Sequence, residues 1–164
     1  MIQVADRLWI GYSSDVEHGN LTGITALLNV AWDLKYHKFD PEHKEQERVV
    51  QACEYAQVGL VDGPGNLLSS YCSAVLTLRM LLDRHDGVLV YDHDGGRALV
   101  VTMMYLNLIE GKYRPDSLSW SHWLTWDERL VWIEERIKLK LSQRHKAHIE
   151  AFNKIPYGVL EALL

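Results

Sequence analysis

Few cysteines, no long apolar run and no surplus of positive charge mark this sequence. Cys53 and Cys72 are the only cysteines among 164 residues, and their spacing is not that of a metal site. We expect both to be buried small hydrophobic side chains, as in proteins of a reducing compartment. The net charge of −5 gives no electrostatic support for binding to nucleic acid.

Signals for membranes and export are also missing. No apolar run reaches the length of a membrane span, and the first residues, MIQVAD, do not form a signal peptide. The sequence contains no repeat and no low-complexity segment. With a hydrophobic content of 48%, it predicts one folded domain, residues 1–164, in the cytoplasm and without a membrane partner. The oligomeric state is left open.

Hydrophobic runs that alternate with helical patterns predict an α/β fold with a sheet covered on both faces. The expected strands cover residues 4–11, 24–32, 55–61 and 87–91. Residues 67–84 and 97–110 have helical spacing, and Ser13, Ser14 and Asp15 can cap a short helix. Residues 33–51 are polar around Pro41, so we expect an exposed loop that ends in a short helical turn.

The remainder of the chain predicts helices. Asp116 or Ser117 can cap one, and residues 125–128, Thr-Trp-Asp-Glu, form a capping box for a longer one. Residues 138–148 form a basic stretch that we expect to be the solvated face of a helix. Residues 1–111 should therefore hold the sheet, and residues 112–164 should add a helical tail.

The segment VLVYDHDGGRALVV, residues 88–101, combines a hydrophobic strand, a glycine-rich turn and an apolar helix. Such a turn exposes backbone amides at a helix N-terminus and is typical of anion-binding sites. Asp92 and Asp94 lie within it, where two carboxylates oppose the binding of an anion. At about 4 Å, two such charges repel by about 4 kcal/mol near a protein surface.

Four segments resemble, in order, the dual-specificity branch of the protein tyrosine phosphatases. They are RLWIGYSSDV, GITALLNVAW, VGLVDGPGNLL and GVLVYDHDGGRALVVTMMYL, and together they extend over residues 4–110. The resemblance implies a central mixed sheet of four to five strands flanked by helices, with a helical C-terminal tail. It also implies that VGLVDGPGNLL carries the general acid and that residues 92–97 form the phosphate loop.

The sequence departs from this family at the residues that perform its chemistry. The family's loop reads His-Cys, five residues, then Arg. Aligned on the strand, Asp92 takes the place of the nucleophilic cysteine, Gly95 keeps the family's glycine, and Arg97, the phosphate-binding residue, comes one position early. The general-acid position falls on Asp62. Aligned on Arg97 instead, the cysteine position falls on Tyr91, so neither alignment offers a thiol.

The loop comprises Asp92, His93, Asp94, Gly95, Gly96 and Arg97. A carboxylate of Asp92 that points into it would accept from the helix amides and pair with Arg97, as a tethered substitute for phosphate. Because such contacts favour the charged form, we expect a lowered pKa for Asp92.

The leading hypothesis is a pseudophosphatase that acts by binding or scaffolding, without a cofactor. Its partner would be a phosphorylated protein or a small phosphoester, bound weakly. One alternative is an active phosphohydrolase, because VLVYDHDG also resembles the nucleophile motif of the haloacid-dehalogenase-like enzymes. There Asp92 would attack phosphorus, Asp94 would act as acid and base, and magnesium would bind. Another alternative is a cysteine phosphatase whose cysteine has been replaced by Asp92.

Two further features have a structural and a functional interpretation. His93 could be a metal ligand, but no second ligand has suitable spacing, so an exposed turn histidine is favoured and no metal site is expected. The tryptophans of the tail could form a ligand platform, although packing onto the sheet explains them better. These are Trp120, Trp123, Trp126 and Trp132.

Overall fold

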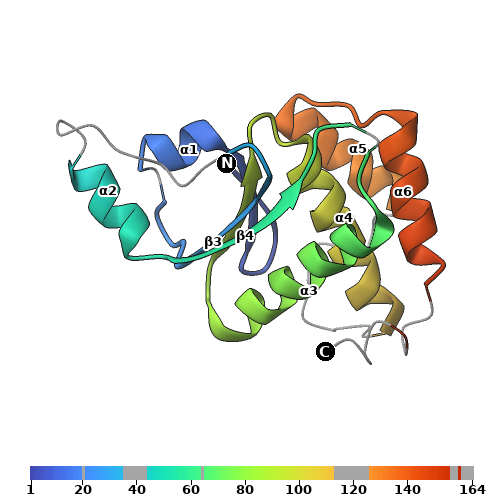
Figure 1. Cartoon of the computed structure of the whole chain (residues 1–164), viewed down its shortest axis with the longest axis horizontal. Coiled ribbons are helices and arrows are strands. Elements are labelled where there is room, and N and C mark those ends of the chain that lie inside the picture. Colours follow the sequence, from blue (N-terminus) through green and yellow to red (C-terminus); the bar gives the residue numbers. More distant parts are fainter. Residues whose placement is uncertain (20, 35–43, 64, 113–125, 156–158, 160–164) are drawn as a thin grey trace.

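A five-stranded mixed sheet forms the centre of the molecule (Figure 1). The computed structural model describes residues 1–19, 21–34, 44–63, 65–112, 126–155 and 159. The sheet has the order β1-β2-β5-β3-β4, and β1 alone runs antiparallel to its neighbour. The strands are β1 (Ile2–Ala5), β2 (Leu8–Tyr12), β3 (Ala26–Ala31), β4 (Glu54–Leu60) and β5 (Val88–Asp92). The prediction of a single sheet is confirmed, and β5 lies at its centre.

A hairpin replaces the single strand predicted at residues 4–11. β1 and β2 pair with each other, and Arg7 adopts a left-handed conformation with φ of 58° in the turn between them. A non-glycine residue in that region is uncommon. The hydrophobic pattern alone therefore gave no signal for the reversal.

Helices cover both faces of the sheet. They are α1 (Ser13–Glu17), α2 (Lys44–Gln51), α3 (Leu68–Arg84), α4 (Gly96–Lys112), α5 (Trp126–Ile137) and α6 (Gln143–Asn153). Side chains alternate between the faces along a strand. Leu89 and Tyr91 of β5 accordingly pack with α1 and α2, whereas Val88 and Val90 join the larger core, which includes side chains of α3 to α6. The predicted α/β fold with helices on both faces is confirmed.

The most apolar helix, α4, is buried in this larger core, and its first residues Ala98 to Val101 are inaccessible to solvent. Its N-terminus lies directly after β5, the central strand. Within the described parts of the chain, no helix is both long enough and apolar enough to cross a membrane.

The helical stretch predicted at residues 138–148 is interrupted. α5 ends at Ile137 and α6 begins at Gln143, after Lys138 in a left-handed conformation with φ of 54°. The carboxylate of Glu134 accepts a hydrogen bond from the backbone N–H of Leu141 at 2.8 Å, and Ser142 caps α6. These contacts stabilise a turn that the charge pattern alone did not reveal.

Other predictions for the connecting segments had mixed outcomes. The end of the polar segment 33–51 forms the eight-residue helix α2 rather than a short turn. Residues 35–43 lie outside the described residues, as do the predicted caps Asp116, Ser117 and Thr125 and the side chains of Trp120, Trp123 and Trp126. Trp132 packs against the larger core, and the guanidinium of Arg136 lies 3.6 Å from the centre of its ring.

Candidate functional site

The carboxyl ends of three parallel strands meet at one edge of the sheet. β5 lies beside β3, and β3 lies beside β4, all in parallel register. Asp33 and Asp62 follow β3 and β4 closely, and Asp92 ends β5. This edge is where open α/β sheets commonly bind ligands.

The connection from β5 to α4 is a tight glycine-containing turn. Gly95 has a positive φ of 84°, a conformation that glycine adopts without strain. A Cβ atom there would lie 3.1 Å from a ring carbon of Tyr12, closer than most Cβ contacts in proteins, so a larger residue would also crowd that ring. α4 begins at Gly96, one residue later.

The carboxylate of Asp92 occupies the space in front of this helix N-terminus. Oδ1 accepts a hydrogen bond from the backbone N–H of Gly95. Oδ2 accepts from the backbone N–H of Arg97 at 2.9 Å and from Nε of Arg97 at 3.0 Å. Asp92 is fully buried. The carboxylate thus binds the amides and the guanidinium that would otherwise be available to an oxyanion.

Arg97 is held by three acceptors. Besides Asp92, its guanidinium donates from Nη1 to the carbonyl of Leu60 at 3.0 Å and to Oδ1 of Asp33 at 3.2 Å. Its side chain is 4% exposed. Burial acts to lower the pKa of Arg97, but the bonds and charges of Asp92 and Asp33 raise it, so the group remains cationic.

Burial raises the pKa of Asp92 above its ordinary value, although the hydrogen bonds from Arg97 act in the opposite direction. The expectation of a lowered pKa was therefore wrong. The sequence indicated the hydrogen-bond donors but not that the carboxyl group would be completely removed from water, which destabilises its charged form.

Asp33 connects Arg97 to the turn residue His93. Oδ2 of Asp33 lies 3.3 Å from Nε2 of His93. The slight burial of Asp33 acts to raise its pKa, but hydrogen bonds from its backbone and from Arg97 lower it overall. His93 is exposed, and the described residues contain no group of three side chains able to hold a metal ion.

The two other predicted carboxylates are exposed at the same edge. Asp94 accepts a hydrogen bond from the backbone N–H of Gly96 at 3.0 Å. Asp62 lies in the loop after β4, where Asn66 binds both the N–H and the carbonyl of Val61 at 2.8 Å. Within the described part of the chain, no hydrogen bond or ion pair joins Asp62 to residues 92–97. Its role as a general acid stays a prediction.

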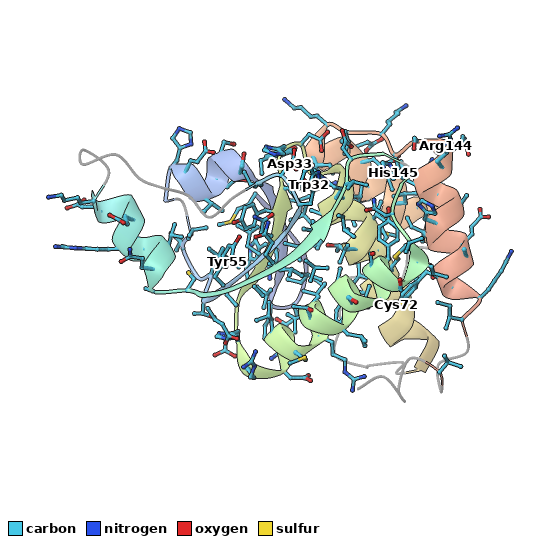
Figure 2. The ribbon with its side chains drawn as sticks, in the orientation of Figure 1. Trp32, Asp33, Tyr55, Cys72, Arg144 and His145 are labelled. Atoms are coloured by element: carbon cyan, nitrogen blue, oxygen red, sulfur yellow. The ribbon has the colours of Figure 1, made fainter. Side chains whose placement is uncertain are left out.

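α6 brings a histidine to this edge that the sequence did not single out as a site residue. The pKa of His145 is lowered by burial first and by the charge of His148, while the charges of Asp62, Asp94 and Asp92 act to raise it. Figure 2 shows His145 near the start of α6, nearer than Arg144 to Trp32 and Asp33.

The cysteines are remote from this chemistry. Cys72 is buried within α3, and Cys53 is half-buried before β4. Burial raises the pKa of both thiols. This disfavours the thiolate form that a nucleophile requires.

Asp33 and the carbonyl of Leu60 are site components that the sequence reasoning missed. A usable signal was present, because Asp33 closely follows a parallel strand as Asp62 does, and Asp92 ends the strand next to it. The helix-derived His145 had no such signal, since its position depends on how α6 packs.

Comparison with known proteins defines the class of fold. No protein-family model and no curated protein sequence matches the chain. Among solved structures, human DUSP28 is similar with a TM-score of 0.68 and 16% identity over 100% of both chains. DUSP15 has a TM-score of 0.70 and 15% identity, covering 99% of this chain and 93% of its own.

A mouse putative dual specificity phosphatase, solved with zinc tungstate, has a TM-score of 0.66 and 18% identity. The match covers 98% of this chain and 88% of that protein. The chain therefore has the dual-specificity phosphatase fold, as the order of its sequence motifs predicted.

Proposed function

We propose that this protein is a pseudophosphatase, a phosphatase-like protein that acts by binding or scaffolding rather than by turnover. The observation that carries the proposal is the position of Asp92. Its carboxylate accepts the hydrogen bonds of Gly95 and Arg97 and so takes the place of a bound phosphate at the N-terminus of α4.

The charges at the site would make the binding of phosphate weak. A phosphate dianion would approach Asp33, Asp92 and Asp94, while the positive charge of Arg97 is already shared between Asp92 and Asp33. Each of these carboxylates opposes the negative charge of such a ligand. A phosphorylated protein or small phosphoester would therefore gain little affinity from its phosphate group.

The geometry supports the aspartyl-phosphate alternative less well. A nucleophilic carboxylate needs an oxygen directed at phosphorus, usually with a magnesium ion to offset the charge. Both oxygens of Asp92 instead accept hydrogen bonds from the loop, and the residue is fully buried. A replaced cysteine remains the other alternative, and the Asp92→Cys variant tests it.

Hydrolysis of an aryl phosphate, with and without magnesium, tests the proposal. We expect no turnover above that of heat-denatured protein in either condition. Turnover that requires magnesium and is lost in Asp92→Asn would support the aspartyl alternative. Turnover lost in Cys53→Ser or Cys72→Ser would overturn the structural role assigned to these thiols.

The proposal also covers the setting of the protein. We place it in the cytoplasm, because its two cysteines are free thiols and such thiols are typical of reducing compartments. We also propose that residues 1–164 form one domain. It needs no cofactor for a binding role. Cell fractionation tests the compartment, and limited proteolysis tests the single domain.

A further inference from the structure

An exposed apolar surface adjoins the loop of residues 92–97, whose amides bind the carboxylate of Asp92. Its apolar members are Trp32, Val61 and Leu67, with exposed fractions of 63%, 37% and 71%. Asp33 and Asp62 lie next to Trp32 and Val61 in the chain and are exposed as well. We call these five residues the rim. Trp32 and Val61 directly follow β3 and β4, which pair side by side, and exposed apolar side chains that lie together are typical of contact surfaces.

Hydrogen bonds hold the backbone of the rim at the ends of β3 and β4. The backbone N–H of Trp32 donates to the carbonyl of Leu60 at 3.1 Å, the same carbonyl that accepts from Arg97. Asn66 holds both the N–H and the carbonyl of Val61 and directly precedes Leu67. A surface that is already ordered loses little conformational entropy on binding.

Among the described residues, four carboxylates lie at this edge of the sheet, those of Asp33, Asp62, Asp92 and Asp94, beside the guanidinium of Arg97. Asp33 and Asp92 pair with it, and Asp62 and Asp94 act together on His145. In the described part of the chain, Asp62 has no ion pair of its own. Figure 2 shows Arg144 at the outer side of α6, farther than His145 from Trp32.

We propose that the rim binds a cationic side chain, an arginine or lysine within a basic, partly apolar peptide segment of a partner protein. The indole of Trp32 offers a face for a cation, and Asp33 and Asp62 offer carboxylates beside it. Val61 and Leu67 would contact apolar neighbours in the same segment. The rim beside the loop thus selects a cation, whereas an open phosphate loop selects an anion. This inference rests on the proposed pseudophosphatase function.

Fluorescence anisotropy with the whole protein tests the inference. The probe is a labelled peptide of alternating arginine and leucine, and the matched peptide carries citrulline, which has nearly the same shape as arginine but no charge. We expect the arginine peptide to bind at least about ten-fold tighter and to weaken as salt rises, because the contacts are exposed charge pairs. Equal binding of the two peptides would overturn the inference.

Variants locate the binding surface. Trp32→Ala and Asp62→Asn should each weaken binding by about two- to ten-fold, the range of exposed cation–π and ion-pair contacts. The matched controls are Met80→Ala, which removes an exposed side chain of α3, and Asp86→Asn, at the opposite end of β5. Losses equal to those of the controls would overturn the assignment to the rim.

The same protein preparations should be tested for aryl-phosphate turnover. Absence of both peptide binding and turnover would refute the cationic ligand and leave the pseudophosphatase proposal standing. Turnover would refute the pseudophosphatase proposal itself. A preference for a phosphorylated peptide over the arginine peptide would show that the site still selects anions and would likewise overturn the inference.

Discussion

At the scale of single residues, Asp92 joins the site to the stability of the fold. Its carboxylate satisfies two backbone N–H groups and a buried guanidinium. Removal of one partner of a buried ion pair leaves the other charge without compensation and is costly. Asp92 is therefore a structural residue as well as the proposed obstacle to phosphate.

Asp92→Ala should lower the free energy of unfolding by about 3–5 kcal/mol, because Arg97 then remains buried without its main partner. Sulfate or phosphate should restore part of this loss by binding the freed amides, as a ligand of the native state does. Urea denaturation in chloride and in sulfate of equal ionic strength measures both effects.

Asp94→Ala is the matched control for this variant, because it removes an exposed carboxylate with one hydrogen bond to Gly96. It should cost at most about 1 kcal/mol and gain no more from sulfate than the wild type. If Asp92→Ala gained no more from sulfate than the wild type, Asp92 would not occupy an anion site.

Asp92→Cys should remain inactive. Position 92 is fully buried, the loop is one residue short of the family spacing, and Asp94 still opposes a dianion. Aryl-phosphate turnover and labelling with iodoacetamide measure the outcome, with Cys53→Ser and Cys72→Ser as the background for labelling. Efficient turnover would show that the short loop is competent and would favour a cysteine replaced by Asp92.

The sequence allowed some of these contacts to be anticipated and not others. Contact between Asp92 and Arg97 follows from their order in a strand, turn and helix. The direction of the pKa shift did not follow, because the complete burial of Asp92 depends on side chains packed around it from other elements. Asp33 was missed because it lies far from the loop in the chain and reaches Arg97 only through the pairing of β3 with β5.

At the scale of elements, an ionic cluster ties the end of α3 to the start of β4. Glu54 accepts from Arg84 and contacts Nε2 of His85, each at 2.6 Å. The bond with His85 is the largest effect that lowers the pKa of Glu54 below 4.5. The cluster holds α3 against the sheet edge opposite the site.

This cluster predicts a pH dependence of stability. Since the pKa of Glu54 is lower in the folded state, the unfolded state binds more protons as the pH approaches 4.5 from above. The contribution of Glu54 is thus present above that pH and is lost as the pH falls through the folded-state value. Glu54→Gln should destabilise the protein at neutral pH and flatten this acid-side loss.

Urea denaturation at a series of pH values measures the effect, and Glu45→Gln, at an exposed position of α2, is the control. If the free energy of unfolding of Glu54→Gln fell with decreasing pH as steeply as that of the wild type, other carboxyl groups would be responsible for the acid-side loss. The boundary between α5 and α6 was harder to predict from the sequence. It depends on a hydrogen bond from the backbone N–H of Leu141 to the carboxylate of Glu134.

At the scale of the whole molecule, the sheet was predictable because its strands β3 and β5 are buried on both faces. Such strands appear in a sequence as continuous hydrophobic runs, and their order matched known motifs. The hairpin of β1 and β2 and the packing of the tail depend on turn conformations and tertiary contacts, which hydrophobic runs do not encode. The position of His145 was not predicted for the same reason, because it depends on how α6 packs.

Gly87 is the point at which three strands of the sheet meet. Its carbonyl accepts from the N–H groups of Thr25 and Ala26 at 2.8 and 3.0 Å, and Val88, the next residue, donates to Arg7 at 2.9 Å. A Cβ atom on Gly87 would lie 1.8 Å from the carbonyl oxygen of Gly23. Such a clash involves backbone on both sides, so no side chain can move to relieve it.

Gly87→Ala should therefore destabilise the whole fold by more than about 3 kcal/mol, beyond the usual range for one substitution. Gly65→Ala is the control, since its Cβ would meet only a side-chain methyl of Val61 at 3.3 Å, and it should change stability by at most about 0.5 kcal/mol. Chemical denaturation followed by circular dichroism compares the two. Equal stabilities would mean that the start of β5 can move away from Gly23 at little cost. The close contact between Gly87 and Gly23 would then not be needed to hold β5 between β2 and β3.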